Sequence, residues 1–215
     1  MPFIEVDRKR ILFVHIPRTG GTSIEKSLGS AAPLRFFCPT QLPFLRVTPQ
    51  HLTFQDMKSL FGTDFFDYSF TVVRDPYRRI ESVYGMRIAL AKDRFIKDVP
   101  PFAVWLQIAL SQASKDSHHL DGHVRPQTDY IGSGMKIFKH ESGLPAIVGR
   151  VSEQTGIPLQ LSEQRYLQSE PAGPIAWDYD SLSLVNKFYA DDFKTLKYNM
   201  RLPEVRENST GELEI

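Results

Sequence analysis

The sequence predicts an α/β fold of three layers, in which helices flank a central and mainly parallel sheet. One observation is that short apolar, β-branched runs alternate with segments of helical periodicity. Strands that alternate with helices are typical of parallel sheets. A second observation is size, because 215 residues, 41% of them hydrophobic, can bury one sizeable core. We therefore expect a single domain over residues 1–200 and a polar tail at residues 201–215.

The first strand is expected at residues 11–16, a short apolar run that is rich in β-branched residues and ends at Pro17. Residues 22–28 then have helical spacing. A loop with two adjacent glycines, Gly20 and Gly21, joins the two segments. This part of the chain therefore has the pattern of a strand, a loop and a helix.

A second unit of the same kind is expected from residue 69 onward. Residues 69–73 resemble another buried strand, and Asp75 and Pro76 are preferred residues for the N-cap and the first position of a helix. Apolar residues then recur on one helical face, at Ile80, Val83, Tyr84, Ile88 and Ala91.

The rest of the chain contains a third unit and two further helical segments. The stretch MKIFKH predicts a strand, and LPAIVGRVSEQTG predicts a helix that ends at Gly156 and Pro158. Before them, PFAVWLQIALSQA predicts an amphipathic helix, with core positions at Phe102, Trp105, Leu106, Ala109 and Leu110. A last apolar stripe consists of Leu182, Val185, Phe188, Tyr189, Phe193 and Leu196.

Composition gives no sign of a nucleic-acid or membrane partner, so neither is expected, although a local basic patch remains possible. Lys and Arg number 26 against 25 Asp and Glu, so the overall charge does not indicate a nucleic-acid or membrane partner. No segment approaches the roughly 20 apolar residues that a bilayer span needs, and the start of the chain lacks the apolar stretch of a signal peptide. We therefore expect a soluble, cytoplasmic protein. A single cysteine, Cys38, cannot form an internal disulfide.

The loop PRTGGTS is a candidate anion site. A loop between a buried strand and a helix directs backbone N–H groups and the helix N-terminus at one spot, which suits phosphate-like groups. Gly20 and Gly21 allow close approach, and Arg18 adds positive charge. The hydroxyl donors of the loop are Thr19, Thr22 and Ser23. A plain glycine turn remains the alternative, because His15 and the missing lysine exclude an ordinary nucleotide-triphosphate loop.

The stretch VVRDPYRRIESVY offers a second anion site. Arg74 stands at the carboxyl end of its expected strand, where open α/β sheets place ligands, and Ser82 follows on the next helix. One cation and one hydroxyl can hold a second phosphate. Taken alone, Arg74 is better explained by a surface ion pair with a carboxylate, and Ser82 by chance. Two strand-to-helix anion sites in one chain are harder to dismiss.

These two motifs carry a family resemblance. HIPRTGGTS resembles the 5′-phosphosulfate loop, and VVRDPYRRIESVY the 3′-phosphate motif, of sulfotransferases that use 3′-phosphoadenosine 5′-phosphosulfate (PAPS). The chain is most similar to the carbohydrate sulfotransferases that include the heparan and uronyl 2-O enzymes. Weaker similarity in PQHLTFQDM, HVRPQTDYIG, KIFKHESG and LVNKFYADDFKTLKY extends the resemblance over residues 11–198.

The resemblance implies a P-loop-NTPase-like sulfotransferase fold, PAPS as the donor, no required metal, and a hydroxyl-bearing acceptor, with a carbohydrate expected. It implies that the loop from Arg18 to Ser23 binds the 5′-phosphosulfate, with Arg18 at the sulfonate where family members usually carry lysine. Arg74 and Ser82 would hold the 3′-phosphate.

The resemblance also suggests the groups that act on the acceptor. His51 is the expected general base, because QHLTF resembles the segment that carries the catalytic histidine in the 2-O enzymes and because imidazole has a suitable pKa. His123 and Arg125 are expected beside the acceptor cleft. His119 and His123 are the alternative bases.

Three other interpretations remain open from the sequence. The chain could be a small-molecule kinase with an atypical loop, which would need Mg²⁺ between phosphates. It could also be a binding module that lost the chemistry, for which Arg18 is the support. A metal site at His119, Asp121 and His123 is weakened by Gly122 and by the lack of further ligands, so no metal is expected.

Overall fold

The computed structural model describes residues 1–93, 99–161 and 175–202. Its sheet has four strands in the order β1-β2-β3-β4. These are β1 (Phe3–Val6), β2 (Lys9–Val14), β3 (Tyr68–Val73) and β4 (Lys136–Lys139). β1 runs antiparallel to β2, whereas β2, β3 and β4 are parallel to one another. The predicted α/β class, the mainly parallel sheet and the three expected strands are therefore confirmed.

The first strand, β1, was not expected from the sequence. It forms a hairpin with β2, in which Val6 is paired with Lys9. The two residues between them, Asp7 and Arg8, both have left-handed backbone angles, with φ of 48° and 65°. Such a turn is normally indicated by Asn-Gly or Asp-Gly, so Asp-Arg carries little signal for a hairpin.

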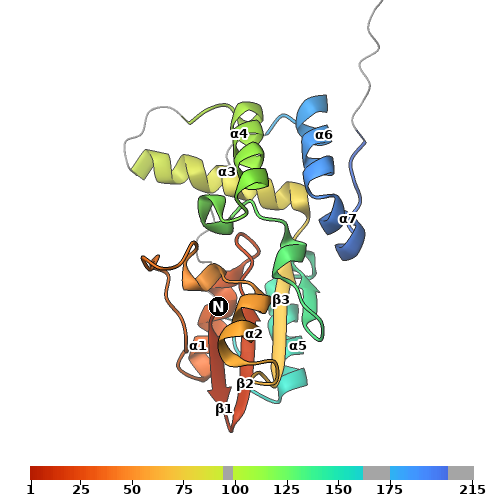
Figure 1. The fold of residues 1–215 in the computed structure, drawn as a ribbon. Coiled ribbons are helices and arrows are strands. Elements are labelled where there is room, and N and C mark those ends of the chain that lie inside the picture. The colour runs from red at the N-terminus through yellow and green to blue at the C-terminus, as the bar shows by residue number, and fades with distance from the viewer. Residues whose placement is uncertain (94–98, 162–174, 203–215) are drawn as a thin grey trace, which may run out of the picture.

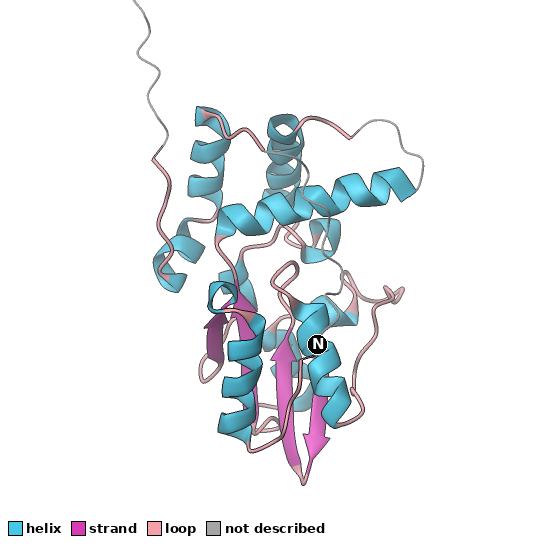
Figure 2. Ribbon diagram, turned by 180° about the vertical axis from the view of Figure 1, so that it is seen from behind, coloured by secondary structure: helices cyan, strands magenta, loops and turns pink. Residues whose placement is uncertain are grey.

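Helices lie on both faces of the sheet (Figures 1 and 2). On one face, α1 (Gly21–Ala31) and α5 (Leu144–Thr155) pack against the strands. α2 (Phe54–Phe61) packs against the opposite face, with Met57 in a buried cluster that includes Leu12 and Val14. This arrangement agrees with the expected three layers. α5 ends at Gly156, whose φ of 73° is left-handed, as its sequence predicts.

A separate group of helices lies beyond the carboxyl ends of the parallel strands, at the top of Figure 1. It consists of α3 (Pro76–Asp93), α4 (Phe102–Lys115), α6 (Tyr179–Phe188) and α7 (Ala190–Leu196). The expected core residues of the amphipathic helix are all buried in its cluster, namely Phe102, Trp105, Leu106, Ala109 and Leu110. The last apolar stripe is shared by α6 and α7. Asp75 caps α3, because its Oδ1 accepts a hydrogen bond from Arg78 N at 3.0 Å.

In the described part of the chain, four short 3₁₀ segments connect these elements, and the first three carry site residues. They are η1 (Pro49–His51), η2 (His119–Gly122), η3 (Gln127–Tyr130) and η4 (His140–Ser142). None of the described helices has the length and apolar character to cross a bilayer. Of the expected polar tail, residues 203–215 lie outside the described part of the chain.

Candidate active site

The loop between β2 and α1 is a compact turn at the carboxyl end of β2. Arg18 and Gly20 both have left-handed backbone angles, with φ of 69° and 90°. The Thr19 hydroxyl donates to Ile16 O at 2.9 Å, and its side chain is fully buried. That hydroxyl therefore holds the loop in shape, and Thr19 can offer a ligand only its backbone.

The start of α1 presents the groups that an anion needs. The amide of Ser23 donates to Gly20 O at 3.1 Å, so the amides of Gly21 and Thr22 precede the first bond that closes the helix. The hydroxyls of Thr22 and Ser23 are half-buried and make no hydrogen bond to any described residue. These amides and hydroxyls are thus available to an oxyanion.

A glycine is required at position 21 by the packing of the His15 ring as well as by the loop. A Cβ atom at this position would lie 2.0 Å from Nε2 of His15, which is inside van der Waals contact. The His15 ring is held there by Glu25, whose Oε1 lies 2.6 Å from Nδ1. Gln50 also donates to the Glu25 carboxylate at 2.9 Å. These buried contacts fix the first turn of α1 beneath the loop.

The two predicted anion sites are in contact. Nε of Arg18 donates to Ser82 Oγ at 3.0 Å, and Nη1 of Arg74 donates to Arg18 O at 3.2 Å. Burial, followed by the charge of Arg74, lowers the pKa of Arg18. Burial also lowers the pKa of Arg74. Two neighbouring cations in a half-buried position favour a bound anion, because it offsets their mutual repulsion.

The backbone of Arg74 is fixed by Gln127, a residue that the sequence analysis did not single out. Arg74 N donates to Gln127 Oε1 at 2.9 Å, and Gln127 Nε2 donates to Arg74 O at 2.8 Å. Gln127 is fully buried, and its backbone amide donates to Asp192 Oδ2 at 2.9 Å. The carboxyl end of β3 is therefore held rigidly against η3 and α7.

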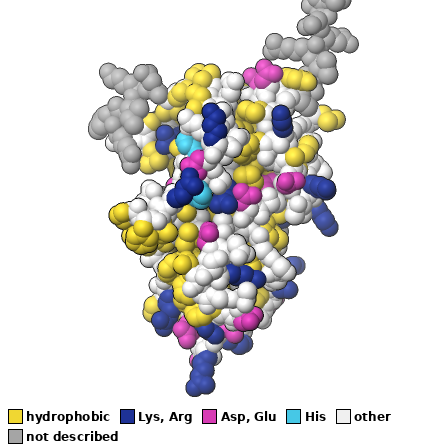
Figure 3. Space-filling view, viewed as in Figure 1, with side chains coloured by type: hydrophobic (Ala, Val, Ile, Leu, Met, Phe, Trp, Pro, Cys, Tyr) yellow, Lys and Arg dark blue, Asp and Glu magenta, His cyan; other side chains and the backbone are white. Residues whose placement is uncertain are grey.

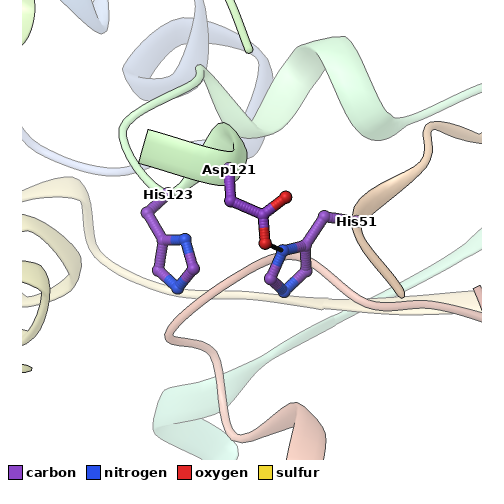
Figure 4. Close-up of side chains that lie close together, drawn as sticks. All are labelled: His51, Asp121 and His123. Atoms are coloured by element: carbon purple, nitrogen blue, oxygen red, sulfur yellow. Dashed lines mark hydrogen bonds and ion pairs between the residues drawn. The ribbon is translucent and has the colours of Figure 1, made fainter. Parts of the chain in front are cut away.

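The buried His51 pairs with the half-buried Asp121, as Figure 4 shows. Nδ1 of His51 lies 2.8 Å from Asp121 Oδ2. Thr48 adds two hydrogen bonds to this carboxylate, from Oγ1 at 3.0 Å and from its amide at 2.6 Å. Because the carboxylate only accepts, the neutral His51 ring carries its proton on Nδ1 and has an unprotonated Nε2.

The pKa values of this pair suit a neutral imidazole beside a carboxylate. Burial lowers the pKa of His51, although the hydrogen bond to Asp121 opposes the shift. Burial alone would raise the pKa of Asp121, but the His51 hydrogen bond and charge and the Thr48 donors outweigh it, so the pKa is lowered. The lowered pKa favours the neutral form of His51, whose Nε2 can accept a proton.

Two more imidazoles flank His51. Its ring centroid lies 5.4 Å from that of His15 and 5.0 Å from that of His123. Nδ1 of His123 donates to Leu120 O at 2.8 Å, and burial, followed by the charge of His51, lowers the pKa of His123 to about 3. In Figure 4 the Nε2 atoms of His51 and His123 point to the same side.

Arg79 joins the loop to the segment that carries His123. Its Nε donates to Pro17 O and its Nη2 donates to His123 O, both at 3.0 Å, and the residue is 2% exposed. Arg79 was not predicted from the sequence. The available signal was that Arg79 stands beside Ile80 and four residues before Val83, at the edge of the apolar face of the predicted helix.

Arg125, the other residue predicted beside the acceptor cleft, contacts residues of its own segment. Arg125 pairs with Asp129 at 2.9 Å and lies over the Tyr130 ring. The metal site considered from the sequence consisted of His119, Asp121 and His123. Among the described residues, the side chains that lie close enough to share an ion are instead His51, Asp121 and His123. Figure 3 shows basic, acidic and histidine side chains gathered midway on this face, between the sheet and the helical group.

Comparison with known protein families gives one match. The family model described as "Sulfotransferase family" matches residues 1–142 of the 215-residue chain. The matched part includes the loop, Arg74, Ser82, and the His51, Asp121 and His123 group. Neither the curated proteins nor the solved structures contain a significant match.

Proposed function

Because the chain belongs to the sulfotransferase family, we propose that it moves a sulfuryl group from PAPS to a hydroxyl of a carbohydrate acceptor. The observation that supports this proposal is the contact between Arg18 and Ser82, which joins the two predicted anion sites. A donor with phosphates at both its 5′ and 3′ positions matches such a pair of sites. A single-phosphate ligand would use only one of them.

The donor would be held by both sites at once. In this arrangement the amides from Gly20 to Thr22 bind the 5′-phosphate, with the Thr22 and Ser23 hydroxyls as further donors. Arg74 supplies the charge for the 3′-phosphate. Ser82 accepts a hydrogen bond from Arg18 at 3.0 Å, and a hydroxyl can accept one bond while it donates another. Ser82 can therefore donate to the 3′-phosphate without releasing Arg18.

The chemical step would depend on fixed positive charge. Sulfuryl transfer resembles phosphoryl transfer, in which a loose, in-line transition state spreads negative charge over equatorial and leaving oxygens. The S–O bond to the leaving 5′-phosphate breaks as a bond from the acceptor oxygen to sulfur forms. Arg18 is the cation of the loop and would stabilise the charge on the leaving phosphate. Its bond to Ser82 restricts where the guanidinium can point.

His51 would accept the proton of the acceptor hydroxyl at Nε2. Asp121 fixes the tautomer through the 2.8 Å contact to Nδ1 and would stabilise the imidazolium that forms. His123 and Arg125 are proposed contacts of the acceptor, because both follow Asp121 on the segment that Arg79 ties to the loop. A sugar, rich in hydroxyls, fits such polar groups.

The test is a transfer assay with radiolabelled PAPS and a panel of sugar, phenol and alcohol acceptors, with products identified by mass spectrometry. We expect label on a hydroxyl, no loss of activity with a magnesium chelator, and much tighter binding of 3′-phosphoadenosine 5′-phosphate than of ATP. Equal binding of the two nucleotides without transfer would contradict the proposal. Chelator-sensitive phosphoryl transfer from ATP would favour a kinase.

A further inference from the structure

His51, Asp121 and His123 form a group with the composition of a metal site. Each of the three can offer one ligand atom, and these atoms lie within 4.8 Å of one another. They come from two separate segments, since His51 ends η1 whereas Asp121 and His123 belong to η2 and the residue after it. We propose that this group binds a divalent transition-metal ion of the zinc class and that the bound ion inhibits the protein.

The donor atoms select the class of ion. Two imidazole nitrogens and one carboxylate oxygen suit Zn²⁺, Co²⁺ or Cu²⁺, whereas Mg²⁺ and Ca²⁺ prefer all-oxygen sites. Three protein ligands leave a fourth position open, as in zinc sites that bind water or substrate.

The ligands are already oriented by their neighbours. Leu120 O accepts from Nδ1 of His123 at 2.8 Å, which leaves the other ring nitrogen unprotonated and able to bind metal. Thr48 holds Asp121 through its amide at 2.6 Å and its hydroxyl at 3.0 Å. Metal ligands usually have such hydrogen-bond partners. A histidine ligand donates to a backbone carbonyl or a carboxylate, and a carboxylate ligand accepts from nearby donors.

The ion would lie between Nδ1 of His51 and the Asp121 carboxylate, where the Nδ1 proton now lies. Nδ1 of His51 and Oδ2 of Asp121 lie 2.8 Å apart, slightly closer than two ligands of one Zn²⁺ ion. A small separation of the two side chains admits the metal, and the single proton of the neutral ring moves from Nδ1 to Nε2, which then can no longer accept a proton. The imidazole and carboxylate are then both engaged by the ion. The inhibition rests on the proposed function, because it removes His51 as a base, but the binding does not.

Metal binding is tested on the full chain after treatment with a chelator. Calorimetry should detect one Zn²⁺ per chain, with no comparable binding of Mg²⁺, and Co²⁺ should give visible d–d absorption. His123→Gln and Asp121→Asn should each lower the Zn²⁺ affinity by about 100-fold or more, since even outer partners of metal sites are worth about 10- to 100-fold. His119→Gln, a change in the same turn, should retain the parental affinity. Binding that survives His123→Gln would overturn the site.

Two further measurements do not depend on the folding of variants. In the unsubstituted protein, Zn²⁺ should shift the imidazole ¹⁵N resonances of His51 and His123 and leave those of His119 unchanged. In the transfer assay, one equivalent of Zn²⁺ should abolish sulfate transfer and a chelator should restore it. Absence of one-to-one binding would overturn the metal site even in an active enzyme. Binding without any transfer activity would count against the proposed function alone, and transfer that continues with Zn²⁺ bound would overturn the inhibition.

Discussion

Ser82 on α3 accepts a hydrogen bond from Nε of Arg18 in the loop before α1, at 3.0 Å. The two residues are 64 positions apart in the chain. Their contact means that the charge of Arg18 is aimed by a hydroxyl from the neighbouring strand-to-helix unit. An arginine can be held in this way because its planar fork has several donors in fixed directions, whereas a lysine offers one compact charge.

Arg18→Ala should lower kcat by about 10²- to 10³-fold, the usual effect of removing one donor that stabilises transition-state charge. The affinity for 3′-phosphoadenosine 5′-phosphate should change much less, because this charge is needed most where negative charge develops. Steady-state kinetics and calorimetry measure the two quantities. Arg18→Lys is the control that keeps the charge. An unchanged kcat in Arg18→Ala would exclude the proposed role.

Arg74→Ala should weaken donor binding through its 3′-phosphate. A charge-assisted contact is worth about 1.5–3 kcal/mol, which corresponds to about 10- to 150-fold in affinity. The measurement is the ratio of affinities for 3′-phosphoadenosine 5′-phosphate and for its 3′-dephosphorylated form, by calorimetry. Arg78→Ala, which changes an exposed arginine in the first turn of α3, should leave that ratio unchanged. If Arg74→Ala keeps the parental ratio, the 3′-phosphate lies elsewhere.

His51→Ala should keep donor binding and lose about 10²- to 10⁴-fold in kcat, the contribution of a positioned base. In the parent, the rate should fall as pH decreases through the pKa of His51, which burial places below 6.5. Asp121 raises that pKa through its hydrogen bond, so Asp121→Asn should move the acid limb to lower pH as well as lower the rate. The kcat profile against pH measures both effects. A parental profile in His51→Ala would transfer the role to His123 or His119.

Gly21→Ala should destabilise the fold and impair the donor site, because its Cβ would lie 2.0 Å from His15 Nε2. Forced packing of this kind costs about 1–3 kcal/mol. The free energy of unfolding in urea and the affinity for the nucleotide are the measurements. Gly29→Ala on the same helix is the matched control, since its Cβ would make only ordinary contacts at 3.6 Å and alanine favours a helix by about 1 kcal/mol. Equal stability of the two variants would contradict the tight packing of His15.

The strand-to-helix units were predictable because their signals are local. A short β-branched run followed by Pro17, or an Asp-Pro pair at the start of a helix, restricts the backbone within a few residues. β1 was missed for the same reason, since the Asp7–Arg8 turn lacks the glycine that usually marks a hairpin. The alternation of these units also predicted the mainly parallel sheet.

The sequence by itself determined the strand-to-helix units of this protein and the residue types of its anion-binding segments, because periodicity, caps and the glycine loop depend on neighbours along the chain. Only the tertiary structure decided which of these residues meet. His51 and Asp121 are separated by 70 positions, and Arg79 contacts both Pro17 and His123 across the fold. Such pairs form when packed helices and strands bring distant segments together, and burial then sets the protonation of His51.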